Sequence, residues 1–264
     1  MATDPGSRAG LPRQAAGQAR RGAPWILMYH SVADEEEDPY LLTVSPERFA
    51  AQMRWLASRG WRGVSIRDLF AARAAGQGGR LVGLTFDDGY ADVAGHVVPV
   101  LRAYGFTATA YLVTDRLGGE NGWDAEGPRK QLLSVQQVRE LAGAGWEIGS
   151  HGLSHRSLPG VPAQQLRREV RDSRRVLEGL VGSRVGGFCY PYGAVDEPAA
   201  RAVEEAGYDY AVAIGHGPLA GRYALPRCYV GDRDGAWRLR AKRHRQGLRD
   251  VVAELRRGGR GVAR

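Results

Sequence analysis

Short apolar runs alternate with longer amphipathic segments along most of this chain. The apolar runs have the length of β-strands and are rich in aliphatic and aromatic residues. We predict strands at residues 25–29, 61–64, 81–86, 106–113, 146–150, 185–190 and 210–214. Regular alternation of strand and helix predicts parallel strands joined by crossover helices.

The segments between the strands carry helix signals. Ser45, which precedes a proline, is expected to cap a helix that ends near Gly60, and Ser65 to cap the next helix. Ser134 and Gln137 form the pattern of a capping box. We predict further helices after residue 88, through residues 166–180 and 197–206, and beyond residue 234. This last helix is expected to pack a moderately apolar stripe, which includes Trp237, Ala241 and His244, onto the barrel.

Length and composition favour a single α/β domain. The chain has 264 residues, of which 43% are hydrophobic, so it can bury one sizeable core. A (β/α) barrel is the leading arrangement, because each group of candidate functional residues follows a strand and barrels build their sites from such loops. A doubly wound open sheet is the structural alternative.

The two ends differ in composition from the centre. Residues 1–24 hold one large aliphatic side chain, Leu11, and are predicted to form a disordered arm without the apolar core of a secretory signal. No apolar run is long enough to span a membrane, so a cytoplasmic location is expected. We assign residues 25–235 to the main domain and 236–264 to a basic C-terminal helix and tail.

Positive charge is concentrated in that tail. The formal net charge is +8, and the segment from Trp237 to Arg264 accounts for all of it. A charge run is usually a solvated face, and the functional alternative is an anionic polymer or a membrane surface as partner. Cys189 and Cys228 lack metal-site spacing and are expected to be free thiols.

Two motifs carry the candidate chemistry. Asp87 and Asp88 follow one predicted strand, while His151 and His155 follow another. One carboxylate and two neutral imidazoles hold a divalent ion such as zinc on three sides and leave a position for water. The second carboxylate is then free to accept a proton. Asp-Asp-Gly alone is equally typical of a turn, so the prediction depends on both motifs and their strands.

A third string, Tyr190-Pro191-Tyr192-Gly193, completes a resemblance to a known family. In this order the motifs are similar to those of the polysaccharide deacetylase family with the NodB homology domain, or carbohydrate esterase family 4. The similarity runs from about residue 25 to about residue 230. The opening segment and Leu225-Pro226-Arg227 resemble the branch that includes poly-β-1,6-N-acetylglucosamine deacetylases. This resemblance implies a distorted (β/α) barrel of about seven parallel strands.

The resemblance also implies roles for individual residues. Asp87 would be the general base, and Asp88, His151 and His155 would bind the metal, most typically Zn²⁺, with Co²⁺, Ni²⁺ or Fe²⁺ as alternatives. The backbone N–H of Tyr192 would complete the oxyanion hole. The implied reaction removes N-acetyl groups from a polysaccharide or glycoside that contains N-acetylhexosamine.

Two positions depart from the family pattern. Cys189 stands where many relatives have an arginine that orients the base. Arg227, at the start of a further predicted strand, is the expected substitute, with an ordinary surface arginine as the alternative. The late histidine that usually serves as general acid is absent, and His30 and His216 are the candidates. We prefer His30, because it follows the first strand; a buried structural histidine is the alternative.

Substrate contacts are expected from Tyr190, Pro191 and Tyr192, and rim aromatics such as Tyr40 and Trp123 could stack on sugar rings. The motifs equally fit an O-acetyl esterase or an amino-sugar deformylase. A non-catalytic carbohydrate-binding relative is a third alternative, although such a protein has no need of a base beside a metal. A non-haem iron oxygenase also uses two histidines and one carboxylate, but the paired aspartates disfavour it.

Overall fold

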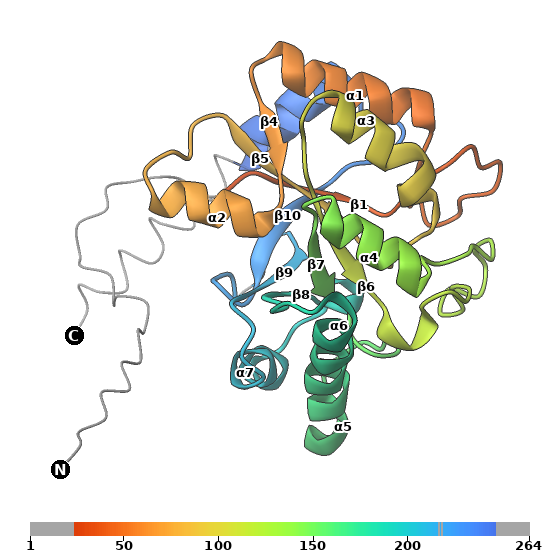
Figure 1. The fold of residues 1–264 in the computed structure, drawn as a ribbon, viewed down its shortest axis with the longest axis vertical. Helices are drawn as coiled ribbons and strands as arrows, with labels where there is room; N and C mark the ends of the chain where they lie inside the picture. Colours follow the sequence, from red (N-terminus) through yellow and green to blue (C-terminus); the bar gives the residue numbers. More distant parts are fainter. Residues whose placement is uncertain (1–23, 216, 218, 247–264) are drawn as a thin grey trace.

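Seven parallel strands close into a barrel in the computed structural model, which describes residues 24–246 apart from 216 and 218 (Figure 1). In order around the barrel they are β1 (Ile26–Tyr29), β5 (Leu81–Phe86), β6 (Thr109–Leu112), β7 (Glu147–Ser150), β8 (Gly187–Cys189), β9 (Tyr210–Ile214) and β10 (Leu225–Tyr229). Strand β1 closes the ring, because Leu27 lies beside Leu84 of β5 and Cys228 of β10. The predicted barrel is confirmed, and the open sheet is wrong.

The barrel is distorted by an extra strand. Strand β4 (Arg62–Val64) pairs with the first half of β5, and β6 pairs with the second half. A separate two-stranded sheet, β2 (Ser31–Val32) with β3 (Thr43–Val44), lies beyond β1 and was not predicted.

Helices surround the barrel. They are α1 (Pro46–Ser58), α2 (Ile66–Ala74), α3 (Val98–Ala103), α4 (Val135–Gly143), α5 (Ala163–Arg167), α6 (Ser173–Val181) and α7 (Glu197–Glu205). The capping box at Ser134 and the cap at Ser65 are confirmed. Ser45 is the N-cap residue of α1, as predicted, but its hydroxyl donates to Asp232 (2.7 Å) and accepts no hydrogen bond from the helix.

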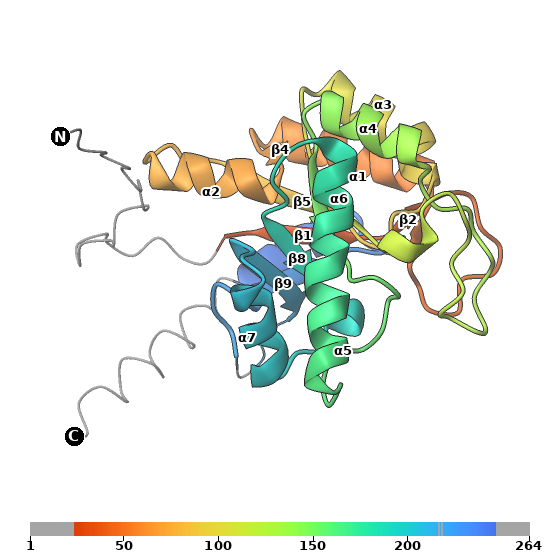
Figure 2. The same ribbon diagram turned by 60° about the horizontal axis from the view of Figure 1, so that its bottom comes forward.

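Two of the predicted helices contain a π-helical turn. The turn η1 (Val93–Val97) precedes α3, and η3 (Arg168–Asp172) joins α5 to α6. Figure 2 shows α5, η3 and α6 as one continuous rod beside the barrel. Two 3₁₀ turns, η2 (Thr114–Arg116) and η4 (Pro191–Gly193), follow β6 and β8. The turns η2 and η4 follow strands, and η1 and η3 precede helices, so all four shape the loops at the carboxyl ends of the strands.

Buried side chains alternate between the two sides of the strands. One large cluster joins the strands to the helices, and a second cluster includes Ile26, Tyr111, Cys189, Tyr210 and Val212. These strand residues alternate with those of the large cluster, so they face the barrel interior. A Cβ atom at Gly149 or Gly187 would overlap the ring of Tyr111 or of Tyr210, respectively. Glycine at these positions therefore makes room for two large rings inside the barrel.

A buried carboxylate lies at the start of β7, at the opposite end from the candidate motifs. Glu147 accepts hydrogen bonds from the Arg67 backbone N–H (2.8 Å), the Thr109 hydroxyl (2.8 Å) and the Tyr210 hydroxyl (2.9 Å). Tyr111 donates to Tyr210 in turn (3.1 Å). Burial raises the pKa of Glu147 above its ordinary value, and these donors only partly oppose the shift.

The C-terminal segment begins as a helix at residues 236–246. Leu239 and Gln246 are buried, whereas Trp237 is 72% exposed and His244 is exposed. The predicted packing stripe is therefore wrong at these positions. The tail beyond residue 246 and the predicted N-terminal arm, apart from Pro24, lie outside the described residues.

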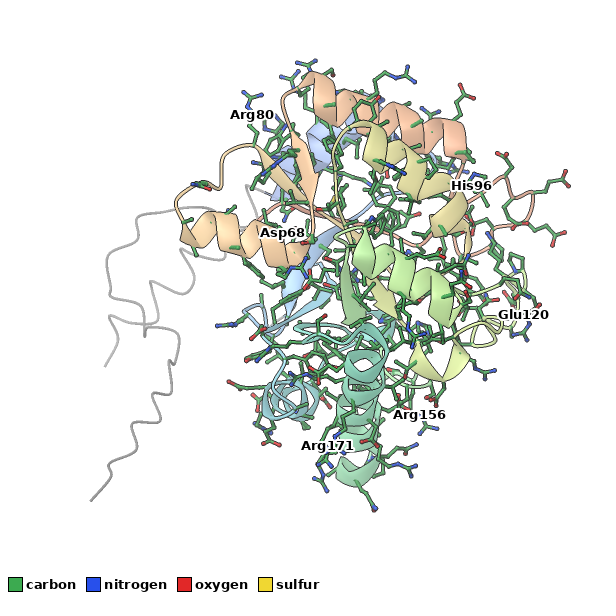
Figure 3. All side chains as sticks on the ribbon, viewed as in Figure 1. Asp68, Arg80, His96, Glu120, Arg156 and Arg171 are labelled. Atoms are coloured by element: carbon green, nitrogen blue, oxygen red, sulfur yellow. The ribbon has the colours of Figure 1, made fainter. Side chains whose placement is uncertain are left out.

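The outer surface carries many charged side chains, among them Arg80, Arg156 and Arg171, which extend into solvent (Figure 3). Within the described part of the chain, no helix combines the length and the hydropathy that crossing a bilayer requires.

Candidate metal centre

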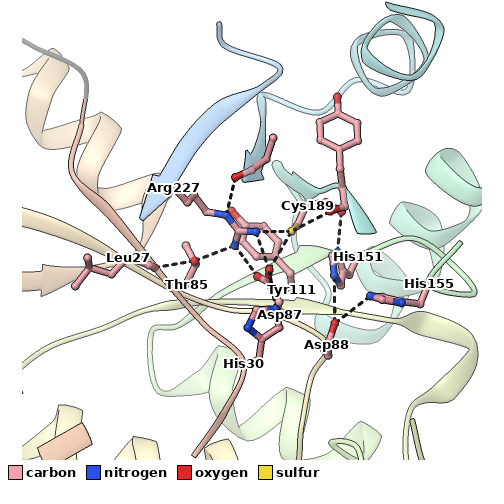
Figure 4. Close-up of polar contacts among 12 residues, drawn as sticks. Leu27, His30, Thr85, Asp87, Asp88, Tyr111, His151, His155, Cys189 and Arg227 are labelled. Atoms are coloured by element: carbon pink, nitrogen blue, oxygen red, sulfur yellow. Dashed lines mark hydrogen bonds and ion pairs between the residues drawn. The ribbon is translucent and has the colours of Figure 1, made fainter. Parts of the chain in front are cut away.

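A sharp bend at the end of β5 separates the two aspartates. Asp88 and Gly89 both adopt positive φ (70° and 79°), a region that Asp tolerates and Gly prefers. The bend directs the carboxylates of Asp87 and Asp88 to different neighbours (Figure 4). Adjacent residues of one strand end can thus take different roles.

Asp88 meets both histidines. Its Oδ1 atom lies 3.2 Å from Nε2 of His151 and 3.2 Å from Nε2 of His155. One ligand atom from each residue lies within 4.8 Å of the others, and all three residues are buried. Burial opposes ionisation of Asp88, but the facing imidazoles outweigh it and hold its pKa well below the ordinary value.

The chemistry of these atoms fits a cation. Nδ1 of His151 lies 2.8 Å from the Cys189 carbonyl oxygen, which can only accept, so Nδ1 carries a proton and a neutral ring would leave Nε2 free to bind a metal. Oδ1 of Asp88 is buried without a hydrogen bond. Buried lone pairs that face one another at 3.2 Å repel unless a positive charge, a proton on the imidazole or a metal ion, lies between them. The residues present therefore fit a divalent metal, as the spacing predicted.

Aromatic rings and a buried carboxylate hold the His155 side. Trp123 stacks on His155 with ring centroids 4.4 Å apart, and Tyr192 packs edge-on at 4.7 Å. His155 itself has positive φ (63°). The preceding loop is fixed by Glu169 of η3, which accepts from the backbone N–H groups of Leu153 (2.9 Å) and Ser154 (3.1 Å).

Asp87 is held by Arg227. Nη1 and Nη2 of Arg227 donate to Oδ1 (2.6 Å) and Oδ2 (2.7 Å) of Asp87, a bidentate pair. Arg227 is 4% exposed, donates also to Thr85 and contacts the Cys189 sulfur (Figure 4). Burial alone would raise the pKa of Asp87, but the charge and hydrogen bonds of Arg227 outweigh it and lower that pKa.

Arg227 lies in the middle of β10 and not at its start, and it is not a surface arginine. Its guanidinium reaches the Asp87 carboxylate from across the barrel and also contacts Cys189. An arginine at position 189 is therefore not needed to orient Asp87. Asp87 also lies near the metal candidates, because one of its oxygens is within 4.8 Å of a ring nitrogen of His151.

His30 approaches Asp87 from the end of β1, with Nε2 3.8 Å from Oδ2. Burial is the main cause that lowers the pKa of His30, which favours the neutral ring. The loop after His30 is fixed by Asp92, which accepts from the Ser31 hydroxyl (2.5 Å) and the Val32 N–H (3.1 Å).

The remaining candidates are placed differently. Tyr190 is fully buried and donates to the Tyr223 carbonyl (2.8 Å), so its ring is not available to stack on a sugar. Pro191 is buried as well, whereas Tyr192 is 51% exposed with positive φ (59°). His216 lies outside the described residues. Cys189 and Cys228 are not joined in a disulfide bond.

The sequence reasoning missed Asp92 and Glu169. Each lies at a π-helical turn and accepts backbone N–H groups of a loop that carries a candidate histidine. A signal for Glu169 exists in the sequence. It lies three residues after Leu166, on the apolar stripe of a predicted helix, where a buried carboxylate requires a partner.

Comparison with known proteins agrees with this geometry. A family model for polysaccharide deacetylase matches residues 74–211, more than half of the chain. The Bacillus subtilis protein YxkH, named as a polysaccharide deacetylase, is 30% identical over 210 residues, which are 78% of this chain and 70% of the relative. The chain belongs to the polysaccharide deacetylase family.

Two further relatives extend the comparison. A poly-β-1,6-N-acetyl-D-glucosamine N-deacetylase of Staphylococcus epidermidis is 24% identical over 201 residues, 71% of this chain and 68% of the relative. The Streptococcus pyogenes deacetylase PplD, solved in complex with acetate, has a TM-score of 0.72 at 22% identity, over 84% of this chain and 98% of that chain. The predicted class, a deacetylase hydrolase of a typically metal-dependent family, is confirmed.

Proposed function

We propose that this chain is a zinc-dependent de-N-acetylase of a poly-β-1,6-linked N-acetylhexosamine polymer. The observation that carries the proposal is the convergence of Asp88, His151 and His155 beside a separate carboxylate, Asp87, that a buried arginine holds in place. The relation to a poly-β-1,6-N-acetylglucosamine deacetylase supports the choice of linkage.

Asp88, His151 and His155 would hold the ion, and their set of one oxygen and two nitrogens suits Zn²⁺. A divalent ion of this kind lowers the pKa of a water from about 16 to about 7 and polarises the acetyl oxygen. The carbonyl of Cys189, bonded to Nδ1 of His151, would keep that ring in the tautomer that presents Nε2.

Asp87 would be the general base. Arg227 keeps the Asp87 carboxylate ionised and fixes its plane, so it can accept a proton from the attacking water. The water oxygen bonds to the acetyl carbon and the carbon–nitrogen bond breaks. Acetate and an amine are the products, and the amine takes up a proton.

His30 would supply that proton. Its Nε2 faces Asp87 Oδ2 at 3.8 Å, so a proton accepted by Asp87 has a short route to the imidazole. Arg227 cannot serve, because a guanidinium does not give up its proton in proteins. The backbone N–H of Tyr192 would stabilise the oxyanion, an interaction worth about 3 kcal/mol in comparable sites.

One experiment separates this proposal from its alternatives. The purified protein is analysed for bound metal and incubated with acetylated β-1,6-linked oligomers, chitooligomers, O-acetylated xylan oligomers and N-formyl glucosamine, and the products are weighed by mass spectrometry. We expect stoichiometric zinc and loss of acetyl mass from the β-1,6-linked oligomers first. Loss of mass only from the ester or the formamide would contradict the proposed reaction.

The basic tail is proposed to add affinity for an anionic polymer. Deletion of residues 247–264 keeps the described helix, including buried Leu239, and removes +3 of the +8 charge between Trp237 and Arg264. Binding of the full chain to heparin should weaken steeply with salt, and the deletion should lower that salt dependence by roughly the share of charge removed. Equal, salt-insensitive binding of both forms would refute a role for the tail.

A further inference from the structure

An open hollow lies between the loop before β3 and the loop that follows η2. Residues from both loops and from the strand ends line it: Ser31, Asp38, Tyr40, Leu42, Thr43, Tyr90, Asn121, Asp124, Gly127, Pro128 and Lys130. The lining combines charged and polar side chains with two aromatic rings, which offer hydrogen bonds and a ring face to a sugar unit.

The hollow adjoins the candidate metal centre. Tyr90 lies in its lining, and the Asp88 carboxylate is close enough to be one cause of the raised pKa of the Tyr90 hydroxyl, after burial. Asp124 lies close enough to the charges of Asp88, His155 and His30 for each to affect its pKa. A polymer that presents one sugar unit to the metal centre would therefore place a neighbouring unit here.

Most polar groups of the lining are already bonded within the protein. Asp38 accepts from the backbone N–H groups of Leu42 (2.9 Å) and Thr43 (2.8 Å). Lys130 donates to two hydroxyls and pairs with Glu35 at 3.1 Å. Asn121 donates to the Pro128 carbonyl and accepts from Lys130 N–H.

Asp124 and its neighbour Trp123 differ from these groups. Within the described part of the chain, no hydrogen bond or ion pair reaches the Asp124 carboxylate. The indole N–H of Trp123 is buried without an acceptor, while its ring stacks on His155. Asp124 therefore offers an unpaired acceptor to the hollow, and its neighbour in sequence, Trp123, holds an orphaned donor against the metal-site ring of His155.

The charge of the hollow favours a cation. Glu35 balances Lys130, so Asp38 and Asp124 leave the lining with an excess of negative charge. The proposed reaction turns a neutral acetamide into an amine, which is protonated at neutral pH. Tyr40, 42% exposed, offers a ring face on which a sugar unit could lie.

We propose that this hollow is a subsite for a hexosamine unit that has already lost its acetyl group, and that Asp124 binds its ammonium. The inference rests on the proposed function, since it concerns a neighbouring unit of the same polymer. Each deacetylated unit then assists binding of the next acetylated unit, so deacetylation proceeds in runs along the chain and not at random.

The test compares two β-1,6-linked oligomers of equal length, one fully acetylated and one with a single free amine next to an acetylated unit. We expect the wild-type protein to release acetate from the amine-bearing oligomer with a kcat/KM about 10-fold higher per acetyl group, mainly through KM. Asp124→Asn keeps the shape of the side chain and removes its charge, so it should abolish this preference. Its kcat/KM on the fully acetylated oligomer should change by less than about 3-fold. Glu126→Gln, an exposed acid two residues away and outside the lining, is the matched control and should keep the preference.

Direct binding separates this inference from the proposed function. The fully deacetylated oligomer should bind the wild-type protein in calorimetry, more weakly at 0.5 M salt, and about 10-fold more weakly to Asp124→Asn. Binding of this kind without any acetate release would leave the subsite standing and refute the proposed reaction. Acetate release without a preference for the amine-bearing oligomer would refute the subsite. An equal loss of kcat/KM on both oligomers in Asp124→Asn would also refute the subsite, because it would indicate that Asp124 binds a sugar hydroxyl and not the ammonium.

Discussion

The two ends of the barrel each bury a carboxylate, and the two environments have opposite effects. Asp87, at the carboxyl end of β5, faces the guanidinium of Arg227, and its pKa is lowered. Glu147, at the amino end of β7, meets only neutral donors, and its pKa is raised. Burial acts on both in the same direction. The charge and hydrogen bonds of Arg227 outweigh it at Asp87, whereas the hydrogen bonds and the charge of Arg67 do not outweigh it at Glu147.

This difference separates a catalytic end from a structural end. An ionised carboxylate held by an arginine is ready to accept a proton at neutral pH. A buried carboxyl whose pKa is raised, within a network of hydroxyls, binds the strands together at the end away from the candidate motifs. The same barrel thus supports chemistry at one end and stability at the other, as barrels of this kind usually do.

The largest expected effect follows from removal of the base itself. Asp87→Asn keeps the shape but accepts no proton, so we expect kcat to fall by at least about 100-fold. Metal content should stay near that of the wild type, because Asp87 is not among the three proposed ligands. Acetate release by the variant and its metal content are measured together, and near-normal turnover would contradict the role of Asp87.

The next largest effect is expected from replacing Arg227, whose positive charge faces Asp87. Arg227→Lys keeps one charge but loses the bidentate geometry, so we expect kcat/KM to fall by about 10-fold. Arg227 lowers the pKa of Asp87, so weaker pairing should raise that pKa and move the acid limb of the pH–rate profile to higher pH. If the acid limb of the pH–rate profile is unchanged in a folded Arg227→Lys variant, Arg227 does not set the ionisation of Asp87.

A smaller effect is expected at the loop that carries His155. Glu169→Gln replaces one of the two oxygens that fix Leu153 and Ser154, so we expect metal affinity to weaken by about 10-fold. Affinity is measured by competition with a chelator, and thermal unfolding of the metal-free protein reports general damage. Glu197→Gln, at an exposed pair with Arg201, is the control. Equal affinities in the two variants would exclude a positioning role for Glu169.

The smallest effect on activity is expected at the other end of the barrel. The pKa of Glu147 is raised in the folded protein, so the unfolded chain loses this proton at lower pH and the free energy of unfolding falls as pH rises between the two values. The fall is about 1.4 kcal/mol for each unit of pKa shift. Glu147→Gln does not ionise and should lack this fall while kcat stays within about 2-fold. Denaturant unfolding of the wild type and Glu147→Gln from pH 4 to pH 8 measures this difference. If the free energy of unfolding depends on pH in the same way in both proteins, the raised pKa of Glu147 is contradicted.

Much of the fold followed from local signals. The strand over residues 81–86 is a continuous apolar run, and the capping box at Ser134 agrees with the helix that it starts. Such features depend on neighbours in the sequence. The paired motifs could be found for the same reason, since strand ends of a parallel barrel lie on one rim.

Features that depend on distant residues were missed or misplaced. Arg227 pairs with Asp87 across 140 positions of sequence, and it was expected there from the family resemblance and not from any local pattern. Glu169 and Asp92 bind backbone N–H groups of distant loops, so the sequence does not reveal their partners, even though the place of Glu169 on an apolar stripe marks it as buried. Trp237 was expected to pack, but Leu239 takes the buried position, because the helix turns another face toward the barrel.

The most direct test of the account is the metal content of Asp88→Ala and His155→Ala, measured by elemental analysis against the wild-type protein and Asp87→Asn. We predict stoichiometric divalent metal in the wild type and in Asp87→Asn, and a loss of most of it in both alanine variants. Full occupancy in the folded Asp88→Ala and His155→Ala proteins would contradict the proposed metal centre and the mechanism built on it.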